Sequence, residues 1–125
     1  MSGSIAADKN NRTSPAESLR TIEHAHDFIE ANFREPLSVM NICADSAISL
    51  SKLERTFRRE LNMSPTEYIL ARRLVAVNSE LKRASSNDKH VAQIAMDCGF
   101  SHLGRFSGVY RAHFGELPSE TLRYR

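Results

Sequence analysis

The sequence predicts an all-α fold in which two helix-turn-helix subdomains are joined by one long linker helix. Apolar residues recur every three or four positions, and serine, proline and glycine residues divide the chain at helical intervals. One residue pattern also occurs twice, with one extra residue at the turn of the second copy. The first copy contains Ile42, Asp45, Ser49, Leu53, Phe57, Arg58, Leu61, Asn62 and Pro65. The second copy contains Ile94, Asp97, Ser101, Phe106, Tyr110, Arg111, Phe114, Gly115 and Pro118.

Length and composition suit one compact domain, because 125 residues with 41% apolar content can supply a modest core. The sequence contains no apolar run near the roughly 18 residues of a membrane span, and no secretory signal pattern. We therefore expect a cytoplasmic protein without a membrane partner. Cys43 and Cys98 lie on apolar stripes, so both are expected in the core and not in a disulfide.

The N-terminal part divides into a leader and a scaffold helix. Residues 1–15 are polar and aperiodic, which predicts a disordered lead or a remnant of cloning, followed by the domain at 16–125. From Pro15 an amphipathic helix is predicted, ending before Pro36. Its expected stripe is Leu19, Ile22, His26, Phe28, Ile29 and Phe33. The net charge is +2, with residues 16–35 acidic and residues 36–125 basic, so the positive charge lies where the motifs lie.

The first motif is predicted at 38–61, with Ser38 and Ser49 as N-caps of its two helices. Its inward-facing residues are expected to be Val39, Ile42, Cys43, Ile48, Leu53 and Phe57. Asn62 is expected to end the second helix in a left-handed conformation. A linker helix at 65–83 follows, with Pro65 at its first position and Ser64 and Glu67 forming a capping box. A helix of this length spans roughly 25 to 30 Å, close to one turn of B-DNA.

The second motif is predicted at 90–114, after a polar loop at 84–89. Gly99 is expected to make its turn with a positive backbone angle. Its second helix should run from Leu103 to Phe114, with Phe106, Val109, Tyr110 and Phe114 facing the core. A short helix near Pro118 is expected to close the domain.

The two copies, together with residues between them, carry a recognisable set of identities. The set includes Ser49, Leu53, Arg55, Phe57, Ser64, Pro65, Tyr68, Arg73, Ile94, Ala95, Gly99, Phe100, Ser101 and the stretch from Phe106 to Pro118. This set resembles the DNA-binding domain of the AraC/XylS family of bacterial transcription regulators, over about residues 20–124. The stretch GFSHLGRFSGVYRAHFGELPSETL is most similar to XylS-like members.

The resemblance implies seven helices forming two homeodomain-like helix-turn-helix units that bind double-stranded promoter DNA. It also implies activation of transcription by contact with RNA polymerase, and no cofactor. The outward residues of the two second helices are expected to read bases: Ser51, Glu54, Arg55, Gly104, Arg105, Ser107 and Gly108. Three positions depart from the family pattern. Ala47 replaces a turn glycine, which suggests a less demanding backbone angle, and Val77 and Thr121 replace an alanine and a tyrosine.

Side-chain chemistry limits what each outward residue can do. Arg55 and Arg105 can each pair with the acceptor edge of guanine, and Glu54 can accept from cytosine or simply pair with Arg58. Gly108 has no side chain, which predicts a laxer second half-site or readout of DNA shape. Phosphate contacts are expected from Lys52, Arg58, Arg59, His102 and Arg111, the alternative for each being a solvated helix face. Arg73 is expected to touch phosphate or to form a structural ion pair.

An enzymatic or metal-binding function is not expected. Of the five histidines, His24 and His26 are two positions apart on a helix and so lie on different faces, and His90, His102 and His113 lack carboxylate or cysteine partners at ligand spacing. The sequence contains no nucleophile and base pair and no phosphate loop.

Two alternatives to an independent regulator remain. The helices could dock a protein, or the chain could be a fragment of a larger ligand-responsive regulator without DNA specificity of its own. The 37 residues before the first motif cannot hold an effector domain, so either the protein works by its abundance alone or the chain is a fragment whose effector domain lies elsewhere.

Overall fold

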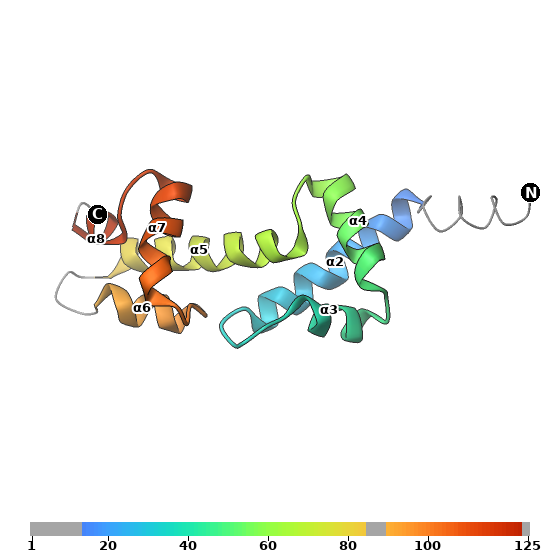
Figure 1. Ribbon diagram of the computed structural model, residues 1–125, viewed down its shortest axis with the longest axis horizontal. Coiled ribbons are helices and arrows are strands. Elements are labelled where there is room, and N and C mark those ends of the chain that lie inside the picture. The colour runs from blue at the N-terminus through green and yellow to red at the C-terminus, as the bar shows by residue number, and fades with distance from the viewer. Residues whose placement is uncertain (1–13, 85–89, 124–125) are drawn as a thin grey trace, which may run out of the picture. The chain divides into compact units, whose positions relative to one another are not determined.

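The computed structural model describes residues 14–84 and 90–123, which form seven α-helices and no strand (Figure 1). The predicted all-α class with two helix-turn-helix subdomains is therefore confirmed. The chain divides into two compact units. Unit 1 contains the chain up to Glu30 and Ser38–Pro65, and unit 2 contains Ala31–Leu37 and Thr66–Arg125. Residues 1–13 of the expected lead, and most of the expected polar loop, lie outside the described residues.

Unit 1 contains the helix pair of the first motif. Its helices are α2 (Pro15–Asn32, whose last two residues belong to unit 2), α3 (Val39–Ser46) and α4 (Leu50–Leu61). The fully buried side chains of its core are Ala25, Ile29, Ile42, Leu53 and Phe57.

The expected apolar stripe of α2 is partly wrong. Leu19 is 57% exposed and His26 is exposed, whereas Ser18 is only 2% exposed. The reason is a polar contact, because the Ser18 hydroxyl accepts a hydrogen bond from Arg59 Nη2 at 2.9 Å. A small side chain is therefore buried where periodicity alone favoured leucine.

The boundaries of the first motif follow from capping residues. The Ser38 hydroxyl accepts from the Asn41 amide, and the Asn41 side chain accepts from the Ser38 amide, which closes a capping box. The Ser49 hydroxyl accepts from the amide of Lys52 at 3.1 Å. Asn62 ends α4 at φ 55° and ψ 34°, in the left-handed region. All three predicted caps are confirmed, because each supplies a partner for a backbone group that the helix leaves unpaired.

Ala47 adopts a positive backbone angle, φ 56° and ψ 42°, with its amide donating to the carbonyl of Cys43. The expectation of a less demanding angle at this position is therefore wrong, because the angle lies in the left-handed region. The turn imposes this angle because it closes the end of α3. An L residue in this conformation costs roughly 1 to 2 kcal/mol.

We expect Ala47→Gly to raise the free energy of unfolding by about 1 kcal/mol, since glycine adopts the left-handed region without steric cost. Urea unfolding followed by circular dichroism would measure the change. Ala44→Gly is the matched control, because Ala44 is exposed in the middle of α3 and should lose about 1 kcal/mol. Equal destabilisation by both substitutions would contradict a strained Ala47.

Unit 2 contains α5 (Pro65–Arg83, from its second residue on), α6 (Val91–Asp97), α7 (Leu103–Phe114) and α8 (Pro118–Arg123). Its second motif differs from the first in capping. His90 and His102 occupy the N-cap positions of α6 and α7, and neither side chain accepts a capping hydrogen bond. Gly99 has φ 101°, as predicted for the turn. The starts of α6 and α7 therefore lack the side-chain caps that the helices of the first motif have.

A hydrogen-bond chain ties α7 to its neighbours. Asn78 Nδ2 donates to the Tyr110 hydroxyl at 2.9 Å, which donates to Thr121 Oγ1 at 2.7 Å, and Thr121 in turn donates to Glu116. Tyr110 and Thr121 are both buried, so their hydroxyls need these partners. The unusual Thr121 is thus a member of the network that orients α7 on α5 and α8. Val77, the other departure within unit 2, is fully buried in the core.

Candidate nucleic-acid interface

Helix α4 presents one polar face to solvent. Leu53, Thr56 and Phe57 are buried on its inner side, while Ser51, Glu54 and Arg55 are exposed. Thr56 was not expected in the core, and it remains satisfied there because its hydroxyl donates to the carbonyl of Lys52 at 2.8 Å. The exposed residues are those that the sequence assigned to base contacts.

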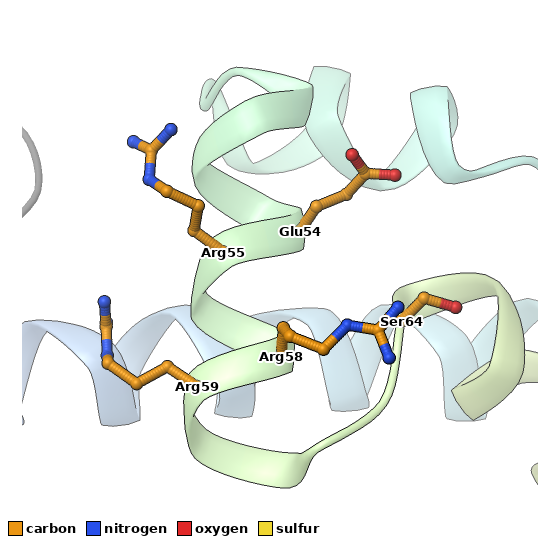
Figure 2. Close-up of a pocket in the computed structure, with 5 residues that line it drawn as sticks. All are labelled: Glu54, Arg55, Arg58, Arg59 and Ser64. Atoms are coloured by element: carbon orange, nitrogen blue, oxygen red, sulfur yellow. The ribbon is translucent and has the colours of Figure 1, made fainter.

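A hollow lies over this face, lined by Glu54, Arg55, Arg58, Arg59 and Ser64. Figure 2 shows Arg55 and Arg59 extending to one side of α4 and Glu54 and Arg58 to the other, with Ser64 on the segment that follows. Three guanidinium groups, one carboxylate and one hydroxyl therefore line the hollow. Guanidinium groups suit phosphates and guanine edges, and a carboxylate suits the amino group of cytosine.

Ser64 is a residue that sequence reasoning missed as a member of this surface. Its position before Pro65 identified it only as a helix cap. Its place in the hollow depends on how the segment after α4 folds back, and no local pattern reports that.

Among the expected phosphate contacts, Lys52 and Arg59 each hydrogen-bond to a residue of α2. Lys52 Nζ donates to Glu17 Oε2 at 2.6 Å, and Arg59 Nη2 donates to Ser18. The hydrogen bond from Lys52, together with its positive charge, lowers the pKa of the Glu17 carboxyl. Both cations lie on the flank of α4 that packs on the first turns of α2. Lys52 and Arg59 therefore help to hold α4 against α2.

Helix α7 presents a different kind of face. Phe106 and Tyr110 are buried, while Gly104, Arg105, Ser107 and Gly108 are exposed. A Cβ atom added at either glycine would have no protein atom within 4 Å. Nothing within the described part of the protein therefore requires glycine at these two positions.

The two arginines of α7 are exposed to solvent. The side chains of Arg105 and Arg111 are exposed, and they make no ion pair or hydrogen bond with the residues that the structure describes. The same holds for His102 at the start of the helix. This face carries positive charge without a neighbouring acid on its own helix.

Arg73 was expected to contact phosphate or to form a structural ion pair. Among the described residues it instead donates hydrogen bonds to two backbone carbonyls. Its Nε donates to the carbonyl of Phe33 at 2.8 Å and its Nη2 to the carbonyl of Glu35 at 3.0 Å. Burial lowers the pKa of this guanidinium. The partners are backbone carbonyls because the chain after α2 leaves these oxygens without helical partners.

The cysteines are both free and buried, in agreement with the core prediction. Cys98 nevertheless has polar neighbours, since its thiol donates to Glu80 Oε2 at 3.4 Å. Burial, followed by the nearby Glu80 carboxylate, raises the pKa of this thiol to about 11. Cys98 is therefore a poor nucleophile, because little thiolate forms at neutral pH.

Other site chemistry is sparse in the described ranges. Residues 14–84 and 90–123 contain no group of three His, Cys, Asp or Glu side chains placed to hold a metal ion. None of the described helices is long and apolar enough to cross a membrane. The exposed faces of α4 and α7 are therefore the candidate interface.

Several known proteins are similar to this chain in sequence and in fold. A family model described as a helix-turn-helix domain matches residues 42–124. The XylDLEGF operon transcriptional activator of Pseudomonas putida is 37% identical over 103 residues, covering 82% of this chain and 32% of that protein. The transcriptional regulator ArgR of Pseudomonas aeruginosa is 38% identical over 97 residues, covering 78% of this chain and 29% of that protein. This chain spans about a third of the length of these relatives.

Solved structures agree with the sequence comparison. A transcriptional regulator with an AraC-type DNA-binding domain from Chromobacterium violaceum superposes with a TM-score of 0.77 at 35% identity. The match covers 86% of this chain and 94% of that one. A probable AraC family regulator from Rhodopseudomonas palustris gives a TM-score of 0.75 at 33% identity, covering 83% and 95% of the two chains.

Proposed function

Because this chain belongs to the AraC/XylS family of helix-turn-helix DNA-binding domains, we propose that it activates transcription by reading promoter DNA with α4 and α7. The family is one of non-enzymatic DNA-binding domains of transcription regulators. The observation that carries the proposal is that the second helix of each motif turns a polar or basic face to solvent. A promoter-binding role places the protein in the bacterial cytoplasm.

In this proposal the two helices read DNA differently. On α4, Arg55 pairs with guanine and Glu54 and Ser51 contact neighbouring bases, because all three are exposed. On α7, Arg105 makes the principal base contact and Ser107 assists. The bare backbone at Gly104 and Gly108 admits close approach of the groove wall, which favours readout of shape.

Phosphate contacts come from cations beside these faces. We assign them to Arg58 on unit 1 and to His102 and Arg111 on unit 2, which are exposed. Lys52 and Arg59 hold α4 on α2 through Glu17 and Ser18, so we assign them a positioning role instead.

Activation by contact with RNA polymerase is the finer part of the proposal. Its support is that the XylDLEGF relatives are named as transcriptional activators. Effector sensing, in this proposal, belongs to sequence outside these 125 residues.

The test is selection of bound duplexes from a random DNA pool at about 150 mM salt, where non-specific binding is already weakened. We expect a site with two short boxes about one helical turn apart. Repeating the selection with Arg55→Ala and with Arg105→Ala should relax one box each. Enrichment of a single box would restrict base reading to one motif. A protein-docking domain would enrich no sequence, and any residual DNA binding would lack the steep salt dependence of phosphate contacts.

A further inference from the structure

The chain passes between the two units at three places: after Glu30, after Leu37 and after Pro65. The last passage is the start of α5, the long linker helix. The first two flank a short segment, Ala31–Leu37, which belongs to unit 2 although unit 1 surrounds it in sequence. We call this segment the strap. Unit 1 is therefore tied to unit 2 by more than the linker helix.

The backbone of the strap is held by α5. Arg73 donates one hydrogen bond to the carbonyl of Phe33 and another to the carbonyl of Glu35, at 2.8 and 3.0 Å. The rigid fork of a guanidinium makes two such bonds from one side chain, which fixes direction as well as distance. Lysine carries its three N–H donors on one nitrogen, so it does not reproduce the two separate nitrogen positions of the guanidinium fork.

The side chains of the strap are held as firmly. Phe33 is only 4% exposed, and the guanidinium of Arg72 lies over its ring at 4.3 Å from the centroid. Arg34 Nη1 reaches Glu80 Oε2 on α5 at 3.0 Å and the carbonyl of Asp97 at the end of α6 at 3.2 Å.

The turn of the second motif closes on the strap as well. A Cβ at Gly99 would lie 2.3 Å from the Phe33 carbonyl oxygen and 2.7 Å from Arg73 Nε. Linker helix, strap and second turn are thus packed without space between them. The strap cannot shift within unit 2 unless several of these contacts break together.

We infer that the strap is a positioning element that sets which spacing of two DNA boxes the protein accepts. This inference rests on the proposed function. One inserted base pair moves the second box by about 3.4 Å and turns it by roughly a tenth of a helical turn. A single helical connection could bend or twist to follow that change. A second connection, pinned along its length by Arg34, Arg72 and Arg73, resists it.

The test uses the full chain with Arg73→Ala and the two-box site selected above, together with the same site lengthened or shortened by one base pair. Affinities are measured well below the melting temperature of each protein, and a single-box duplex is included. We expect the unaltered protein to lose about tenfold or more in affinity on either changed spacing, and Arg73→Ala to lose roughly threefold or less. Affinity for the single-box duplex should stay unchanged, because Arg73 belongs to α5 and not to α4 or α7, the helices proposed to contact bases.

The matched control is Arg83→Ala, which removes the same charge from an exposed position on the same helix. It should keep the spacing preference of the unaltered protein. If Arg73→Ala fails to fold, Arg73→Lys serves in its place, since it keeps the charge and loses one of the two hydrogen bonds. Its spacing preference should be intermediate.

The outcomes separate the inference from the proposed function. Unchanged spacing preference in the folded Arg73 variants would overturn the inference while leaving DNA recognition intact, as would an unaltered protein that tolerates either spacing. Failure of the unaltered protein to prefer any sequence would overturn the proposed function itself.

Discussion

Gly99→Ala is expected to lower the free energy of unfolding by about 3 kcal/mol or more. Two costs combine. A side chain at φ 101° is strained wherever it points, and the new methyl would lie 2.3 Å from the carbonyl oxygen of Phe33. That oxygen cannot retreat cheaply, because it accepts from Arg73 and belongs to a buried residue. The methyl must push the strap away and break these contacts.

Thermal unfolding by circular dichroism would measure this loss, which corresponds to a fall in melting temperature of roughly 10 °C or more. Gly108→Ala is the control, since a Cβ there meets no protein atom and α7 is already helical. Alanine should stabilise that helix by about 1 kcal/mol. A melting temperature for Gly99→Ala within a few degrees of that of the unaltered protein would contradict the close contact between this turn and the Phe33 carbonyl.

Arg55→Ala is expected to weaken specific DNA binding by about 1 to 3 kcal/mol, or roughly five- to 150-fold, with little change in stability. Arg55 is exposed at the centre of the outer face of α4, so truncation leaves no cavity in the core. Alanine also favours helix, which keeps the fold within about 0.5 kcal/mol. The loss should be largest for the selected site and should remove the preference at one base pair.

Fluorescence anisotropy titrations with the selected duplex and with single-base variants would measure the change. Arg20→Ala on α2 removes an equal charge from an exposed position of the same unit and should leave sequence preference intact. Uniform weakening across all duplexes would instead assign Arg55 to phosphate contact. A cooperative loss of folding would assign it to the scaffold.

Local structure was predictable where a particular residue type pairs an unpaired backbone group or tolerates an unusual backbone angle. Ser38 and Ser49 cap helices because a hydroxyl can accept from an unpaired amide, and Asn62 ends α4 because asparagine tolerates left-handed angles. Gly99 was predicted at the second turn for the same kind of reason. The doubled apolar pattern likewise predicted Leu53, Phe57, Phe106 and Tyr110 as core, because helical spacing places them on one face.

The reading faces followed from the same periodicity. Once the core positions of α4 and α7 were known, the exposed positions of Arg55 and Arg105 followed by subtraction. Their contact with bases is still a prediction, since exposure alone does not specify a partner. The effect of each substitution on sequence preference decides that.

The partners of the long charged side chains were not predictable. From the sequence, phosphate contacts were considered for Lys52, Arg59 and Arg73. In the structure, each of them hydrogen-bonds to residues between 35 and 41 positions away in sequence. Glu17, Ser18 and the Phe33 carbonyl become their neighbours only after the helices pack. No local spacing contains that information.

The sequence by itself therefore determined the helices, their ends, the repeated motif and the residues that face solvent, because these depend on interactions between residues a few positions apart. Only the tertiary structure decided which cations hold the scaffold, why Ser18 is buried in place of Leu19, and that Ala31–Leu37 belongs to the second unit. Those features depend on which distant groups compete for a few hydrogen-bond partners in a limited volume. The packing of the helices decides which of these groups are paired.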